Sequence, residues 1–322
     1  MFRKFTSIEN AYRQKEVDGC YSLGADEVWV AREKLHGANF SFIAHLSKEL
    51  QVIQCQVASR NEVLGTAELV SGFYGCRVVV DRYMEEFINL VGSLRATGLI
   101  EWGDTVQLYG ELYGTGIQRE IQYFQEPYKD FAAFALTTNG AYVSNALLEE
   151  ILSKTKIPLA MCVVTGTLEQ VLAYDVEGES PTAKANGVTG TVTEGIVISP
   201  WFIQDARLSN GKVAVLKKKS TAFQEKKTIK TKAPSVLDDE LKPVVEDFSL
   251  YLSEARLSNV MSKIGDVSLP KEFGKVTGLF VQDALEDFEK DQGAIDKEVW
   301  SKIKKYIQQQ ATTIVRAELI QK

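Results

Sequence analysis

The stretch 27–40 constrains the fold more than any other part of the chain, because it places one lysine between a strand and a glycine turn. Residues 27–31 are mostly apolar and predict a β-strand. Glu33 precedes Lys34, and His36 with the following glycine comes after it. A lysine held in this way can attack the phosphorus of a nucleotide and form a phosphoramidate, which divides one difficult transfer into easier steps. The pattern K-x-x-G also occurs by chance, and an exposed lysine at a hairpin is the alternative.

Composition bounds the class of protein. With 322 residues, 45% of them hydrophobic and 25% charged, the chain can bury a full core and form one large domain or a large and a small one. No apolar run approaches the roughly 18 residues that cross a bilayer, and residues 1–4 lack the following apolar stretch of a signal peptide. Four cysteines without C-x-x-C spacing and two histidines argue against a disulfide framework and a structural zinc site. We therefore expect a cytoplasmic protein, with no membrane segment and with reduced thiols.

Charge is distributed unevenly along the chain. The net charge of -6 argues against a protein that coats nucleic acid indiscriminately, yet residues 217–232 contain seven lysines and one acid, Glu225. A basic stripe on an acidic protein can bind phosphates at one face. For residues 226–232 a solvated linker is an equally good interpretation, and the sequence leaves both open.

The segment after the lysine turn predicts a hairpin followed by helices. Strand-like runs at 39–44 and 50–57 flank a turn at 46–49. Arg60 comes just past the second strand, where its guanidinium could approach a phosphate or carboxylate; a surface arginine is the alternative. Residues 66–98 have apolar side chains at helical spacing and predict one or two helices packed on a sheet.

Two further strands carry candidate ligand-binding side chains. Residues 105–112 alternate, and Glu111 lies between two glycines at the strand end. Glycine there allows close approach of the backbone to a ligand, and the carboxylate could accept hydrogen bonds from ribose hydroxyls; a turn acid is the alternative. In a strand at 130–136, Phe131 and Phe134 face opposite sides. One should be core and the other could stack on a purine, and parity does not say which.

The last strands of this region end in charged residues. Glu194 opens an apolar strand. In a strand at 212–220, a period of two places Lys217 and Lys219 on one face and Lys218 on the other. Because burying uncompensated lysines is costly, such a pair usually has an anionic partner. Two lysines aimed together can also lower the pKa of a neighbouring lysine and so activate it.

With the candidate residues named above in this order and at these spacings, the chain resembles the RNA ligase 2 family typified by T-even bacteriophages, whose relatives include the kinetoplastid RNA-editing ligases. The segments that match motifs I, Ia, III, IIIa, IV and V of covalent nucleotidyltransferases are 34–37, 59–60, 109–111, 130–136, 194–197 and 217–219. The specific marks are His36, where DNA ligases commonly have aspartate, and Asn39 with the phenylalanine after it. The match also runs through residues 1–4, 114–118 and 263–283, so it covers nearly the whole chain.

The resemblance implies roles for individual residues. It assigns Lys34 as the nucleophile that becomes adenylylated, and His36 as a residue needed for sealing. The catalytic set is completed by the motif V lysines, Lys217 and Lys219, which would contact the α-phosphate. The residues that it assigns to the ATP site are Glu33, Lys34, Asn39, Arg60, Glu111, Phe134, Glu194, Lys217 and Lys219.

Within the ATP site, the resemblance implies that Phe134 stacks on adenine and that Asn39, Arg60 and Glu111 contact the ribose and phosphates. Glu194 would hold the divalent metal, if necessary through water. One departure is Ala135, where the family often has aspartate after the aromatic, and the hydrogen bonding beside Phe134 is therefore open.

The implied reaction has three steps. Lys34 attacks ATP and releases pyrophosphate, an RNA 5′-phosphate takes the AMP to give an RNA-adenylylate, and a 3′-OH displaces AMP. Each step is an in-line displacement at phosphorus, so catalysis should come from positioning and from charge neutralisation by lysines and Mg²⁺ or Mn²⁺. The implied partner is RNA, in the form of a nicked duplex. A monomer is expected, and the resemblance implies the cytoplasm of a phage-infected bacterial host.

We expect an α+β fold in two domains. Residues 1–234 would form a nucleotidyltransferase domain of antiparallel sheets with flanking helices, which grips ATP in a cleft. Residues 235–322 would form a small all-helical domain, because apolar side chains recur at helical spacing in 236–261, 274–288 and 299–319. The resemblance implies that this second domain engages the nicked duplex.

Three alternatives stand beside an RNA ligase. An ATP-dependent DNA ligase and a capping-type guanylyltransferase share the lysine chemistry, but His36 and the lack of a β-rich tail argue against both. An RNA-binding relative that has lost catalysis is disfavoured by the presence of Lys34, Glu111 and Glu194. Transfer of label from ATP, from GTP or from neither distinguishes the three.

Overall fold

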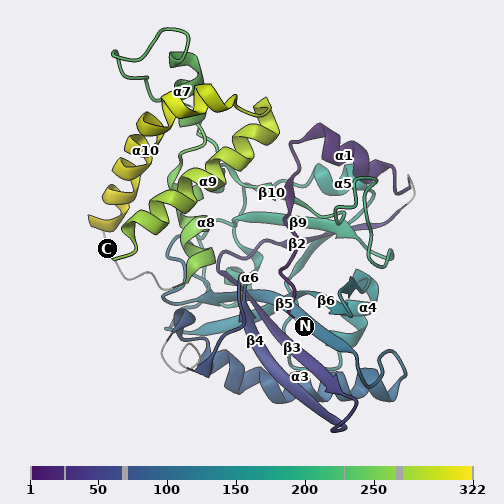
Figure 1. The fold of residues 1–322 in the computed structure, drawn as a ribbon. Helices are drawn as coiled ribbons and strands as arrows, with labels where there is room; N and C mark the ends of the chain where they lie inside the picture. Colours follow the sequence, from purple (N-terminus) through teal and green to yellow (C-terminus); the bar gives the residue numbers. More distant parts are fainter. Residues whose placement is uncertain (1, 25–26, 67–71, 228, 266–270, 321–322) are drawn as a thin grey trace. The chain divides into compact units, whose positions relative to one another are not determined.

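The chain forms two compact units, Met1–Ala222 and Phe223–Lys322 (Figure 1). This computed structural model describes residues 2–24, 27–66, 72–227, 229–265 and 271–320. The predicted domain boundary at 234/235 lies later than the division between the units. In the intervening segment, the backbone N–H groups of Lys227 and Thr231 donate to Leu250 O and Ser249 Oγ, both at 2.7 Å. The segment is thus tied to the second unit, and the roles assigned to the two domains stay predictions.

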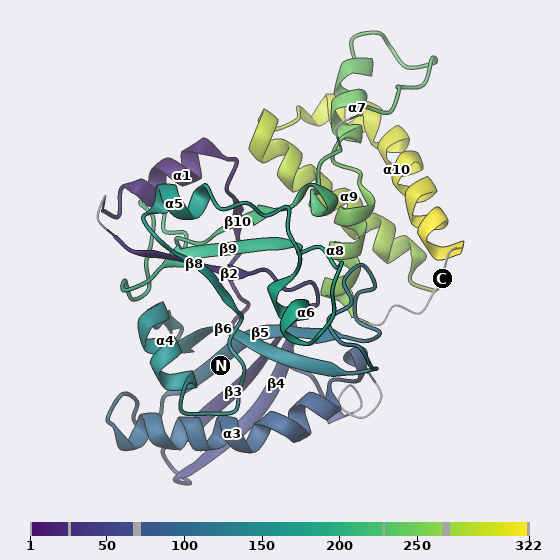
Figure 2. The same ribbon diagram turned by 180° about the vertical axis from the view of Figure 1, so that it is seen from behind.

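The first unit contains two five-stranded sheets among its described residues. In spatial order, the first sheet consists of β1 (Glu9–Asn10), β10 (Leu216–Lys219), β9 (Gly195–Pro200), β2 (Trp29–Glu33) and β8 (Cys162–Gly166). The pairing of β1 with β10 is parallel, and the other pairings are antiparallel. The helices α1 (Gln14–Tyr21) and α5 (Leu168–Leu172) cover one face of this sheet and share a core with it (Figures 1 and 2). The polar segment 6–20 is therefore helical only in its second part.

The second sheet is antiparallel throughout. Its spatial order is β4 (Val52–Ser59), β3 (Ala38–Ser47), β5 (Thr105–Gly114), β6 (Lys129–Thr138) and β7 (Ala141–Tyr142). The predicted hairpin is confirmed as β3 and β4; β3 is longer than the expected 39–44, and β4 lies two residues later than the expected 50–57. One face of the sheet packs on α3 (Arg77–Ala96), because the apolar spacing in this helix buries Tyr83, Phe87 and Leu90 (Figure 2). The short helix α4 (Asn145–Leu152) contributes two leucines to the same core.

The second unit is helical. Its helices are α7 (Lys242–Ser249), α8 (Glu254–Ile264), α9 (Phe273–Gln292) and α10 (Lys297–Ile320), and their apolar faces share one core. The helical spacing across 236–261 corresponds to two helices, because the chain turns after α7, and Ser253 Oγ accepts the N–H of Arg256 to begin α8. The hydrophobic period runs through the break because both helices face the same core.

Two lysines of the basic segment 226–232 contact side chains of their own unit. Lys226 Nζ donates to the hydroxyl of Tyr251 at 2.8 Å, and Lys230 Nζ pairs with Asp247 at 2.5 Å. These contacts favour an anchored connector over a solvated linker. Among the described helices, none is both long enough and apolar enough to span a membrane.

Candidate active site

The segment 34–37 carries the chain from the first sheet to the second. The strand β2 ends at Glu33, and β3 begins at Ala38, so Lys34 lies where the two sheets come closest along the chain. The backbone N–H of Lys34 donates to Gly195 O at 2.9 Å, which fixes the crossing to the start of β9. A Cβ at Gly37 would lie 2.2 Å from Leu112 O of β5, so only glycine permits this approach.

Glu194 joins the catalytic candidates into one cluster. Its side chain is 1% exposed, and its Oε1 lies 2.7 Å from Lys34 Nζ and 2.9 Å from Lys219 Nζ. Its Oε2 lies 3.1 Å from Nδ1 of His36. Burial alone would raise the pKa of Glu194, but the charges of Lys219 and Lys34 outweigh it and hold that pKa well below its usual range. Motifs I, IV and V thus meet at one ionised carboxylate.

A glycine allows Glu194 and Lys219 to meet. Gly195 has φ +142°, and a Cβ there would lie 2.1 Å from Lys218 O. This close approach seats β10 against β9, with Lys219 directly opposite Gly195 in the register. A larger residue would push the lysine strand away from the carboxylate.

His36 is held through both ring nitrogens. Its Nε2 lies 3.1 Å from Oε2 of Glu120, opposite the contact of Nδ1 with Glu194. Burial alone would lower the pKa of His36, but the hydrogen bonds and charges of Glu120 and Glu194 outweigh it, and the net shift is upward. The backbone N–H of His36 donates to the hydroxyl of Tyr123 at 2.7 Å. The histidine is therefore oriented by three groups.

Glu111, Asn39 and Arg60 come from adjacent strands of the second sheet. Asn39 on β3 is opposite Glu111 on β5, and Arg60 directly follows β4, on the other side of β3. Burial raises the pKa of Glu111 to about 7, against the nearby charge of Lys34, which lowers it. Glu194 adds to the rise, whereas His36 and Arg60 oppose it. The carboxyl of motif III is thus within electrostatic reach of the cluster around Glu194.

A β-bulge places Phe134. Tyr109 of β5 is opposite Ala135, and Gly110 is opposite Ala133, so Phe134 is an extra residue between two pairs. Phe131 is fully buried in the core with α3, which confirms that one of the two aromatics is core. Phe134 is half-buried and packs edge-on against Phe5, with ring centroids 4.8 Å apart. Stacking of adenine on Phe134 stays a prediction.

Gly110 lies close to the ring of a core aromatic. A Cβ at this position would lie 2.3 Å from the ring of Phe131. The glycine before Glu111 therefore makes room for a core aromatic, and the approach of a ligand to this backbone stays a prediction.

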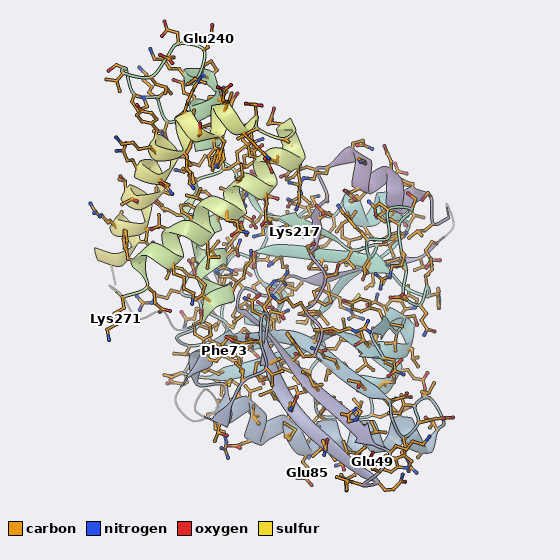
Figure 3. The ribbon with its side chains drawn as sticks, in the orientation of Figure 1. Glu49, Phe73, Glu85, Lys217, Glu240 and Lys271 are labelled. Carbon is orange, nitrogen blue, oxygen red and sulfur yellow. The ribbon has the colours of Figure 1, made fainter. Side chains whose placement is uncertain are left out.

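The three consecutive lysines divide between two faces of β10, as predicted. Lys219 faces Glu194, whereas Lys218 Nζ donates to Leu172 O and Tyr174 O, at 2.8 and 2.7 Å, at the end of α5. Lys217, labelled in Figure 3, lies opposite Val197 in the register. Alternation along the strand places it on the same side as Lys219. The strand itself is shorter than the predicted 212–220 and begins at Leu216.

Glu33, which is also assigned to the ATP site, contacts the segment at the start of a short helix. It is 2% exposed and accepts hydrogen bonds from Ser180 Oγ at 2.5 Å and from the N–H of Thr182 at 2.8 Å. Burial raises the pKa of Glu33 against these hydrogen bonds, which lower it. The carboxylate anchors the start of α6 (Pro181–Ala185), and its contact with a nucleotide stays a prediction.

The site can hold a divalent metal only with a single protein carboxylate among the ligands. The described residues contain no group of three or more His, Cys, Asp or Glu side chains that could hold a metal ion. Within the same part of the chain, Oε1 of Glu194 is buried without a well-formed hydrogen bond, although it pairs with two lysines. Because Mg²⁺ retains several waters and uses few protein ligands, Glu194 could hold such an ion together with water and phosphate oxygens.

Sequence reasoning missed three residues at this site. Glu120 and Tyr123 lie in the loop between β5 and β6, and Phe5 comes from the N-terminal segment. Neither place shows a periodic pattern. The one available signal was their closeness to segments 1–4 and 114–118, which match the family.

Comparison with known proteins agrees with the resemblance to RNA ligases that the sequence motifs indicate. A family model described as RNA ligase matches residues 27–219, more than half of the chain, and one described as T4 RNA ligase 2 C-terminal matches residues 235–315. The mitochondrial RNA-editing ligase 2 of Trypanosoma brucei brucei is 26% identical over 358 residues, which cover 90% of this chain and 84% of that protein. RNA-editing ligase 1 of the same organism is 28% identical over 341 residues, covering 84% and 71%.

Among solved structures, the chain is similar to a Naegleria gruberi RNA ligase with PPi, at a TM-score of 0.48 and 17% identity, over 69% of this chain and 57% of that one. It is also similar to an archaeal ATP-dependent RNA ligase, at a TM-score of 0.43 and 14% identity, over 99% of this chain and 66% of that one. On the family models and the motifs assembled around Glu194, the chain belongs to the RNA ligase family.

Proposed function

We propose that the protein is an ATP-dependent RNA ligase that seals 3′-OH and 5′-phosphate RNA ends, preferentially at nicks in duplex RNA. The reaction would pass through a covalent AMP adduct on Lys34 and an RNA-adenylylate.

The observation that carries this proposal is the placement of Lys34 Nζ at 2.7 Å from Glu194 Oε1, with Lys219 on the same oxygen and His36 on the other. The Lys34 side chain is 20% exposed, so it can be reached from solvent while its direction is fixed. An entering α-phosphate would compete with Glu194 for the two ammonium groups. This exchange of one anion for another requires no rearrangement of the strands.

The remaining predicted ATP residues support the proposal through their positions. Asn39, Glu111 and Arg60 line adjacent strands next to the Lys34 crossing, and Phe134 projects from the bulge of the next strand. ATP would thus contact both sheets, with its phosphates at the lysines and its base at the aromatic. A divalent ion, Mg²⁺ or Mn²⁺, would supply charge neutralisation on the phosphates, with Glu194 as its protein ligand or as a ligand of its water.

The RNA specificity rests on the family and on the second unit. The relatives named above are RNA-editing ligases, and residues 235–315 match the C-terminal family of T4 RNA ligase 2. Recognition of a nick needs phosphate contacts on both sides of the break, and a separate helical unit could supply them beyond the catalytic unit. We also propose a monomer that acts in a cytoplasm, whereas the relatives are named as mitochondrial proteins.

The deciding experiment incubates the protein with ATP or GTP labelled at the α-phosphate and a divalent metal, followed by a denaturing gel. We expect a protein-bound label from ATP alone. Label from GTP would indicate a capping-type guanylyltransferase, and label from neither would indicate a non-catalytic RNA-binding relative. Sealing assays on a panel of nicked RNA, DNA and mixed duplexes would then separate an RNA ligase from a DNA ligase.

A further inference from the structure

We propose that the carboxylate of Glu120 occupies a phosphate subsite at His36, from which the 5′-phosphate of an RNA strand displaces it. The inference rests on the proposed function and names the residue that closes this part of the site in the absence of RNA.

Two donors converge on one oxygen of Glu120. Its Oε2 lies 3.1 Å from Nε2 of His36 and accepts the backbone N–H of Arg119 at 2.9 Å. An anionic oxygen that receives a ring N–H and a backbone N–H has the surroundings that proteins offer to phosphate oxygens. The side chain of Arg119 is exposed.

The imidazole of His36 lies between two carboxylates. Its Nδ1 faces Glu194 and its Nε2 faces Glu120, each at 3.1 Å. A phosphate oxygen could replace either acid without leaving a donor unpaired.

Exposure decides which acid gives way. The Glu194 side chain is 1% exposed and is held by two lysines, whereas the Glu120 side chain is 45% exposed in the loop between β5 and β6. Ion pairs open to water contribute little to stability and are readily exchanged, while removing one partner from a buried set is costly. Glu120 is therefore the acid that an incoming phosphate displaces.

The position of this subsite suits the 5′-phosphate of an RNA strand. His36 shares Glu194 with Lys34, so a phosphate at Nε2 lies on the far side of the imidazole from the nucleophile. The 5′-phosphate bound there would lie beside the AMP carried by Lys34 and would not occupy the position of the AMP.

The test measures binding of nicked duplex RNA by fluorescence anisotropy, without ATP or divalent metal so that no chemistry occurs. The probes differ only in a 5′-phosphate or a 5′-hydroxyl at the nick. For Glu120→Gln and Glu120→Ala we expect tighter binding of the 5′-phosphate probe by about two- to fivefold, the range that an exposed ion pair contributes. Affinity for the 5′-hydroxyl probe should change no more than it does in the control variant described next.

Glu126→Gln is the matched control, because Glu126 is an exposed acid in the same loop. Neutralising Glu126 removes the same negative charge near the RNA, so it should change the affinity for both probes equally. Equal effects of Glu120→Gln on the two probes, or weaker binding of the 5′-phosphate probe, would overturn the proposal; weaker binding would make Glu120 an orienting group for His36. Label transfer from ATP to the unmodified protein reports separately on the proposed function, since this binding test does not require it.

Discussion

Replacing Glu111 by glutamine should stabilise the protein in a pH-dependent manner while it impairs the ATP reaction. Burial raises the pKa of Glu111 from its ordinary 4.5 to about 7. In the unfolded chain this carboxyl returns to its ordinary value. Between pH 4.5 and about 7, the carboxyl of Glu111 is protonated in the folded state and ionised in the unfolded state. The contribution of Glu111 to the free energy of unfolding is therefore complete below pH 4.5 and is lost as the pH rises through about 7.

The size of the effect follows from the same numbers. The step from 4.5 to about 7 corresponds to about 3 kcal/mol of unfolding free energy at high pH. Water and relaxation around a partly exposed side chain reduce this figure, and we expect about 1–2 kcal/mol. Glutamine resembles the neutral carboxyl and cannot ionise, so Glu111→Gln should gain this amount at pH 8.5 relative to pH 5.

The measurement is calorimetric unfolding of both proteins at the two pH values, which records the transitions of the two units separately. Glu101→Gln is the control, because Glu101 is an exposed acid just before the same strand. Adenylylation of Glu111→Gln should fall, because the amide is a weaker acceptor for ribose hydroxyls. An equal stability change at pH 5 and pH 8.5 would refute the assignment of a raised pKa to Glu111.

Three further predictions concern the lysines and the second unit. Lys34→Ala should abolish the AMP adduct on a denaturing gel without changing the circular dichroism spectrum, and an adduct of undiminished yield would place the nucleophile elsewhere. Lys218→Met should lower the free energy of unfolding by about 1–3 kcal/mol, since it removes two charged hydrogen bonds to carbonyls, yet it should still form the AMP adduct. Lys219→Met should lose most of its adduct formation. Equal losses of adduct in the two variants would contradict the division of the lysines between the two faces of β10. A fragment ending at Ala222 should still form the adduct, but it should bind nicked RNA weakly and with a reduced salt dependence. If the fragment seals nicked RNA at the full rate at low RNA concentration, the second unit is not a substrate clamp.

The parts of the site that follow a simple period were predictable from the sequence. Alternation along β10 separates Lys219 from Lys218, and the antiparallel hairpin after Lys34 follows from two apolar runs around a polar turn. These features depend on local geometry, which a period of two describes completely. The α+β class and the helical second unit were predictable for the same reason.

Features that depend on irregular backbone were not predictable in this way. The bulge at Phe134 inserts one residue into the alternation, so parity alone cannot place the side chains on either side of it. The contact of Glu120 with His36 joins residues 84 apart through a loop without a pattern. The break between α7 and α8 is hidden because both helices bury the same apolar period.

Gly37 and Gly195 set limits on how this enzyme can change. A Cβ at either position would fall 2.2 or 2.1 Å from a carbonyl oxygen of the facing strand, although neither residue carries a group that could react. In a library that samples every substitution, both positions should be as intolerant as Lys34 when survival depends on activity. Variation that alters substrate preference while keeping the chemistry must therefore accumulate in the connecting loops, such as the one that carries Glu120, and leave the spacing of the strands unchanged.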